Sequence, residues 1–140
     1  MAGTVNLLRR AKGDLTTAQR NIDHWSDEVE LDIAAYHLQQ AVEKMLKFKL
    51  TLHGISWEFT HDIDKLLDIF DANSIPYPDW IGNYSITITQ FATHTRYGKN
   101  LVASKRVLDK LLPLIASYLT TLQAEENSDT NFSPKTEGLI

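Results

Sequence analysis

The chain has 140 residues, and 43% of them are hydrophobic, which is enough for one globular domain with a sizeable core. The formal net charge of −4 argues against a protein whose whole surface binds nucleic acid, although it allows a local basic patch. The absence of cysteine excludes disulfides, thiolate catalysis and sulfur-ligated metal sites. No apolar run approaches the roughly 20 residues that cross a bilayer, so we expect a cytoplasmic protein without membrane contact.

The first half of the chain predicts two long helices. Apolar residues recur at helical spacing through residues 4–25, which predicts a first amphipathic helix. Ser26 is the predicted N-cap of a second helix, because its hydroxyl can accept from free N–H groups of the first turn. This second helix runs to about His53, where Gly54 suits the left-handed position after the last turn.

Three further helices are predicted in the second half. Thr60 is a candidate N-cap for a third helix that ends at Asn73. Residues 81–91 repeat their large apolar side chains at intervals of three, four and three, which favours a helix over a strand. Residues 102–123 form another strong amphipathic pattern, in which Pro113 predicts a kink or a short interruption.

These elements predict an all-α fold: an up-and-down four-helix bundle with a fifth, short or peripheral helix. The helical patterns fill residues 1–124, which we interpret as one domain. Residues 125–140 are polar and aperiodic, and we expect a disordered tail there.

The second helix carries a polar stripe opposite its apolar face. At about 100° per residue, this stripe contains Tyr36, Gln40, Glu43, Lys44 and Lys47. The simpler interpretation is a solvated face with an ion pair between Glu43 and Lys47. The alternative is that two copies of the helix meet in a dimer and gather these groups into one cleft. Lys47 would then attract phosphate, and Tyr36 would stack on a ligand.

Three other residues could line such a cleft. His61 either hydrogen-bonds a neighbouring helix or acts in the cleft as a donor or acid-base group. Arg96 either caps the last carbonyls of its helix or binds phosphate with its planar guanidinium, which the adjacent Tyr97 can orient. The histidines include no His-x-x-x-His pair and no Gly-rich phosphate loop occurs, so we predict neither a metal site nor a cofactor.

Three segments, in this order, resemble the HEPN family of small all-α domains. The first is AAYHLQQAVEKMLKFKL at residues 34–50, the second is Thr60-His61, and the third is Arg96-Tyr97 before a break. The resemblance covers roughly residues 5 to 122. It implies a four-helix core, homodimerisation and a polar cleft near the dimer interface.

The family contains both enzymes and binding proteins. Many members are ribonucleases, frequently toxins paired with a nucleotidyltransferase-like antitoxin. Others are non-catalytic and bind nucleotides or support a nucleotidyltransferase. The nuclease members carry an Arg, then a polar residue, and a His four to six intervening residues after the Arg.

This chain departs from the nuclease motif. After Arg96 the candidate positions for the His are 101–103, a Leu, a Val and an Ala, and none of them can transfer a proton. We therefore predict a non-catalytic homodimer that binds a nucleotide or RNA, with a nucleotidyltransferase-type partner in a toxin-antitoxin-type pair. The alternatives are a ribonuclease that draws on His61, His94 or Glu43, and a structural module whose polar stripe binds another helix.

Overall fold

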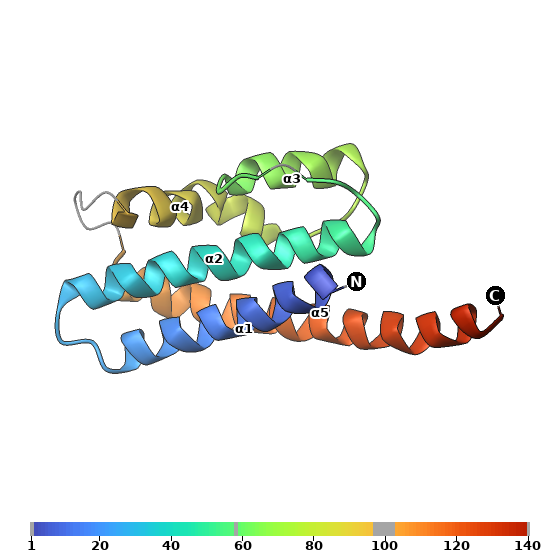
Figure 1. Cartoon of the computed structure of the whole chain (residues 1–140). Helices are drawn as coiled ribbons and strands as arrows, with labels where there is room; N and C mark the ends of the chain where they lie inside the picture. Colours follow the sequence, from blue (N-terminus) through green and yellow to red (C-terminus); the bar gives the residue numbers. More distant parts are fainter. Residues whose placement is uncertain (1, 58, 97–102, 140) are drawn as a thin grey trace.

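The computed structural model describes the backbone of residues 2–57, 59–96 and 103–139 (Figure 1), and the side chains of residues 6–57, 59–93 and 103–128. The chain forms five helices, and no strand occurs in these ranges. This confirms the predicted all-α fold. The helices are α1 (Ala2–Asp23), α2 (Glu28–Leu52), α3 (Ile63–Ala72), α4 (Asp79–Arg96) and α5 (Lys105–Leu139).

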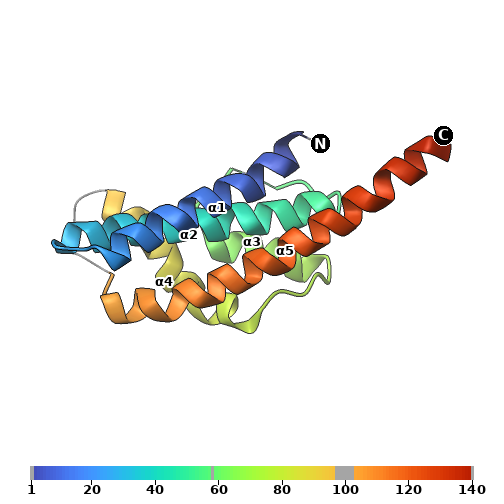
Figure 2. The same ribbon diagram turned by 90° about the horizontal axis from the view of Figure 1, so that it is seen from below.

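Helix α2 is the centre of the fold and packs against each of the other four helices. Figure 1 shows α3 and α4 on one side of α2 and α1 and α5 on the other, and Figure 2 shows α1 and α5 from that second side. Helices α1, α2, α4 and α5 form the predicted four-helix core, with the short α3 packed on α2 and α4. None of the helices in the described ranges combines the length and apolar character that a bilayer-spanning helix needs.

The start of α2 is fixed by a capping box. Asp27 is the N-cap, and its carboxylate accepts from the backbone N–H of Val29 at 2.9 Å. The Glu30 carboxylate in turn accepts from the backbone N–H of Asp27 at 3.2 Å. Our assignment of Ser26 as the cap was wrong by one residue, because the Ser26 hydroxyl donates to Glu30 instead. The predicted left-handed Gly54 after the helix is confirmed by its φ of 72°.

Helix α3 starts later than predicted. Its N-cap is Asp62, whose carboxylate accepts from the backbone N–H of Lys65, and not Thr60. The Thr60 hydroxyl accepts from the backbone N–H of Asp62 at 3.0 Å, so it orders the turn that precedes the helix. The predicted end at Asn73 is confirmed, since Asn73 is the C-cap.

Helix α5 is longer and more regular than predicted. It runs without interruption through Pro113, whose side chain is exposed while the neighbouring Leu111 and Ile115 are buried in the core. It also continues beyond residue 123, where Glu125 forms an ion pair with Lys49 of α2 at 2.5 Å. The division into a domain of residues 1–124 and a tail of residues 125–140 stays a prediction.

Candidate functional site

The polar stripe of α2 is partly buried. Glu43 is 5% exposed and Lys47 is 4% exposed, so the expected solvated face was wrong for these two residues. Their predicted ion pair does form, with Lys47 Nζ at 2.9 Å from Glu43 Oε2. Tyr36, Gln40 and Lys44 are half-buried. The physical reason is that the connection after α2 folds back over this face, where Trp57 contacts Lys47 and His61 contacts Glu43.

The Glu43 carboxylate is the hub of this region. Its Oε1 accepts hydrogen bonds from Gln39 Nε2 at 3.1 Å and His61 Nδ1 at 2.7 Å, while its Oε2 accepts from Lys47. Burial by itself would raise the pKa of Glu43, but the bonds from His61, Lys47 and Gln39 outweigh burial and lower the pKa below 4.5. Glu43 is therefore an anion. Its hydrogen-bond donors come from the adjacent turns of α2, through Gln39 and Lys47, and from the segment before α3, through His61.

A second carboxylate, Asp14 of α1, extends the network. It contacts His37 Nδ1 at 2.8 Å and accepts from Lys44 Nζ at 2.5 Å. The Gln40 side chain bridges the two groups, because it accepts a long contact of 3.5 Å from Lys44 and donates to Gln39 at 2.7 Å. Polar side chains thus connect α1, α2 and the start of α3 in one continuous chain of hydrogen bonds.

The connection between α2 and α3 covers the Lys47 ammonium. Its Nζ lies 4.7 Å from the centre of the Trp57 ring and 5.4 Å from the centre of the Phe59 ring. Trp57 is fixed by a hydrogen bond from its indole N–H to the Thr51 hydroxyl at 3.1 Å. Because a carboxylate and two aromatic faces enclose it, Lys47 organises this connection and is not an open phosphate contact.

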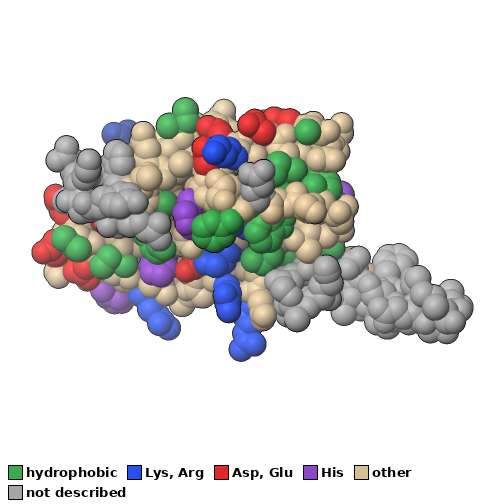
Figure 3. Space-filling model, turned by 45° about the horizontal axis from the view of Figure 1, so that its top comes forward, with side chains coloured by type: hydrophobic (Ala, Val, Ile, Leu, Met, Phe, Trp, Pro, Cys, Tyr) green, Lys and Arg blue, Asp and Glu red, His purple; other side chains and the backbone are tan. Residues whose placement is uncertain are grey.

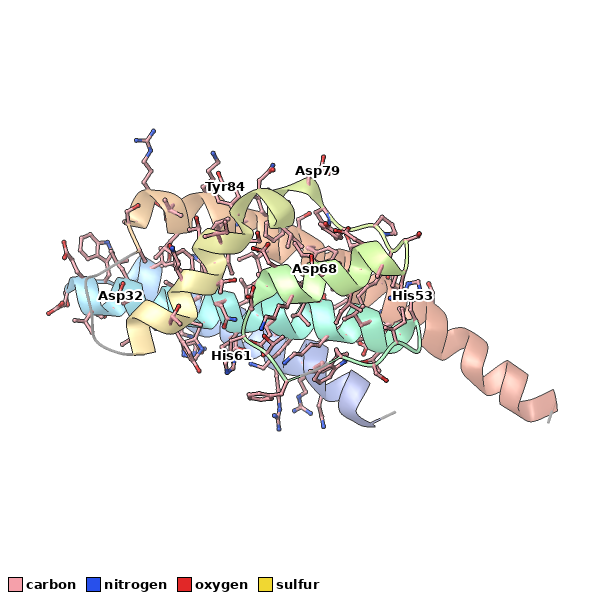
Figure 4. The ribbon with its side chains drawn as sticks, turned by 90° about the horizontal axis from the view of Figure 1, so that it is seen from above. Asp32, His53, His61, Asp68, Asp79 and Tyr84 are labelled. Atoms are coloured by element: carbon pink, nitrogen blue, oxygen red, sulfur yellow. The ribbon has the colours of Figure 1, made fainter. Side chains whose placement is uncertain are left out.

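His61 lies where this connection meets α2, directly before α3 (Figure 4). Its side chain is 33% exposed, although Nδ1 is held by the buried Glu43. Two residues further along the chain, the backbone N–H of Ile63 donates to the Thr89 hydroxyl of α4 at 3.0 Å. His61 thus hydrogen-bonds a neighbouring helix, as the first interpretation expects, and its role as a donor or acid-base group in a cleft stays a prediction.

The Arg96-Tyr97 pair lies largely outside the described residues. Arg96 is the last residue of α4, about 10 Å along the helix axis beyond Thr89, and its side chain is not described. Tyr97 lies outside the described ranges altogether, and the side chain of His94 is not described. The predicted role of this pair in binding phosphate stays a prediction.

A family model for the HEPN domain matches residues 4–124, which include most of the four-helix core. The chain belongs to the HEPN family. Membership supports, in general terms, a function related to nucleotides or RNA. Neither a curated protein nor a solved structure shows significant similarity to the chain.

Sequence reasoning missed several groups of the site in this HEPN domain. Gln39 is fully buried and was hidden by its position between the polar and apolar faces of α2. The contacts of Asp14 could not be found from periodicity, because they join residues 23 and 30 positions apart in the chain. Among the described residues, no group of three His, Asp or Glu side chains could hold a metal ion. The missed residues are Asp14, His37, Gln39, Trp57 and Phe59.

Proposed function

We propose that this HEPN domain binds a nucleotide or an RNA end on the face formed by α2 and the α2–α3 connection, without cleaving it. The observation that carries the proposal is the Glu43–His61 pair, in which a buried carboxylate orients a partly exposed imidazole. Nδ1 of His61 is engaged by Glu43, and Nε2 has no hydrogen-bond partner within the described part of the chain. This nitrogen is free to bond a phosphate oxygen or a base edge.

The sequence after Arg96 and the pairing of Lys47 favour binding over cleavage. Cleavage through the 2′-hydroxyl needs proton transfer beside a cation that stabilises the developing charge. The chain has no His at the motif distance from Arg96, and Lys47, which shares the Glu43 carboxylate with His61, is neutralised by it. A phosphate can bind to such a site, but cleavage lacks the proton-transferring group and the free cation that it needs.

Replacing the predicted phosphate anchor tests the proposal. Arg96→Ala is expected to weaken nucleotide binding by about tenfold or more, because hydrogen bonds to charged groups contribute about 1.5–3 kcal/mol. Isothermal titration of the purified protein with single-stranded oligoadenylate measures the effect, because a strand offers separate phosphates to Arg96 and to other cations. Arg106→Ala, which removes an exposed arginine of α5, is the matched control and should leave affinity unchanged. Equal affinity of the wild type and Arg96→Ala would show that Arg96 does not anchor the phosphate.

We further propose that the domain acts in the cytoplasm as a homodimer, beside a nucleotidyltransferase-type partner in a toxin-antitoxin-type pair. The dimer is supported by a stripe on one face of α2, where the exposed Val29 and Ile33 continue into Tyr36 and Gln40. A face that joins apolar and polar groups in this way suits a second copy better than water. Co-purification with the product of a neighbouring nucleotidyltransferase reading frame tests the partner.

A ribonuclease is the second candidate. The specific observation in its favour is again the Glu43–His61 contact of 2.7 Å, because a carboxylate that orients an imidazole is a common arrangement for a general base. Incubation with single-stranded and structured RNA separates the two functions. Cleavage by the wild type that is abolished in His61→Ala would favour a ribonuclease. RNA that the wild type binds and leaves intact would favour a binding protein.

A further inference from the structure

Phe59 stands apart from the other phenylalanines whose side chains the structure describes. Its side chain is 84% exposed, whereas Phe48, Phe70 and Phe91 are at most 1% exposed. Moving a phenyl ring out of water lowers the free energy of the protein. A ring that stays in solvent forgoes this stabilisation. The position of this ring therefore calls for a physical reason.

The surroundings of Phe59 hold the ring in place without covering it. One side of the ring meets His61 edge-on, with centroids 5.3 Å apart and planes at 74°, and Lys47 Nζ lies 5.4 Å from its centroid. The preceding Trp57 is fixed by its own bond to Thr51. Phe59 is thus a ring with contacts on one side and open water on most of its surface.

An exposed cation lies on the neighbouring helix α1. Arg10 of α1 is exposed, and the described residues offer it no ion pair. It lies one turn before Asp14 on the same face of α1, and α1 runs antiparallel to α2, so Arg10 stands about level with Lys47. Figure 3 shows a face of the molecule on which histidine, hydrophobic and Lys or Arg side chains gather. Unlike Lys44 and Lys47, whose charges meet Asp14 and Glu43, Arg10 is available to a phosphate.

We infer that Phe59 is a stacking platform for an unpaired nucleobase whose phosphate is contacted by Arg10. This inference rests on the proposed function and specifies its ligand: a free nucleotide or a single strand, and not a duplex. Stacking needs an accessible base face, which a paired and stacked base in a duplex does not offer. Every base has such a face, so the platform tolerates different sequences.

Calorimetric titration of wild type and Phe59→Ala tests the platform with two matched probes, AMP and ribose 5-phosphate. The substitution is expected to weaken AMP binding by about 5- to 150-fold, which is the loss of one stacked base. Binding of ribose 5-phosphate, which lacks a base, should not change. Phe59→Trp should keep or strengthen AMP binding, and Ile86→Ala, which truncates an exposed apolar residue of α4, is the matched control.

Single-stranded oligoadenylate, compared with AMP, distinguishes a strand from a free nucleotide as the ligand, and its duplex with oligouridylate should bind more weakly than the single strand. Arg10→Gln should weaken all the single-stranded and nucleotide probes and flatten their salt dependence. Wild type that binds none of the probes would overturn the proposed function itself. If Phe59→Ala binds AMP as tightly as the wild type does, only the stacking role of Phe59 is overturned. An equal loss of AMP and ribose 5-phosphate binding in Phe59→Ala would also overturn it, because the ring would then act through the connection.

Discussion

At the scale of single residues, Glu43 determines how the candidate site responds to acid. Its hydrogen bonds lower its pKa in the folded chain below 4.5, so the folded state binds fewer protons there than the unfolded state. The stabilisation that these bonds provide is therefore fully present above pH 4.5, and it is lost as the pH falls through the lowered pKa of Glu43. Glu43→Gln should remove this acid-dependent component, which urea unfolding between about pH 7 and pH 3 measures.

The same substitution also changes stability at neutral pH. It leaves the Lys47 ammonium buried without a charged partner, which costs up to about 3–5 kcal/mol. The matched control is Asp109→Asn, because its ion pair with Lys105 has the same i, i+4 spacing at an exposed position and should cost at most about 1 kcal/mol. Equal losses for the two variants would show that the Glu43 pair behaves as a surface pair.

At the scale of elements, the start of α2 sets the position of the site, because every contact of Glu43 and Lys47 depends on the register of this helix. Asp27→Ala removes the cap that accepts from Val29 and should lower the free energy of unfolding by about 1 kcal/mol. Asp27→Ser keeps an accepting oxygen and is the control. Chemical denaturation measures both variants, and an unchanged Asp27→Ala would mean that the capping box does not contribute.

Periodicity predicted the helices well and their ends less well. The spacing of large apolar side chains found all five helices, including α4, where the local β-branched residues Thr87, Ile88 and Thr89 favour a strand. The caps were displaced by one and two residues because Asp27 and Asp62 accept from the first-turn N–H groups, whereas the Ser26 hydroxyl donates to Glu30 and the Thr60 hydroxyl accepts from Asp62. In α5 the exposed position of Pro113 allowed the helix to continue.

At the scale of the whole molecule, the apolar stripe at the start of α2 predicts self-association. Light scattering at tens of micromolar should give the mass of a dimer for the wild type. Val29→Glu should give a monomer, because it places a charge at the apolar end of the stripe. Ile86→Glu puts the same charge on an exposed apolar residue of α4 and should stay dimeric. A wild-type monomer would contradict the proposed homodimer.

The sequence by itself determined the all-α class, the helix order and the resemblance to the HEPN family, because these depend on local periodicity and short motifs. Only the tertiary structure decided what the polar stripe does. The stripe became a partly buried network because the connection after α2 folds back over Lys47 and because α1 brings Asp14 to Lys44. Contacts between residues distant in the chain are not encoded in the period of any one helix, so burial and pairing had to come from the packing.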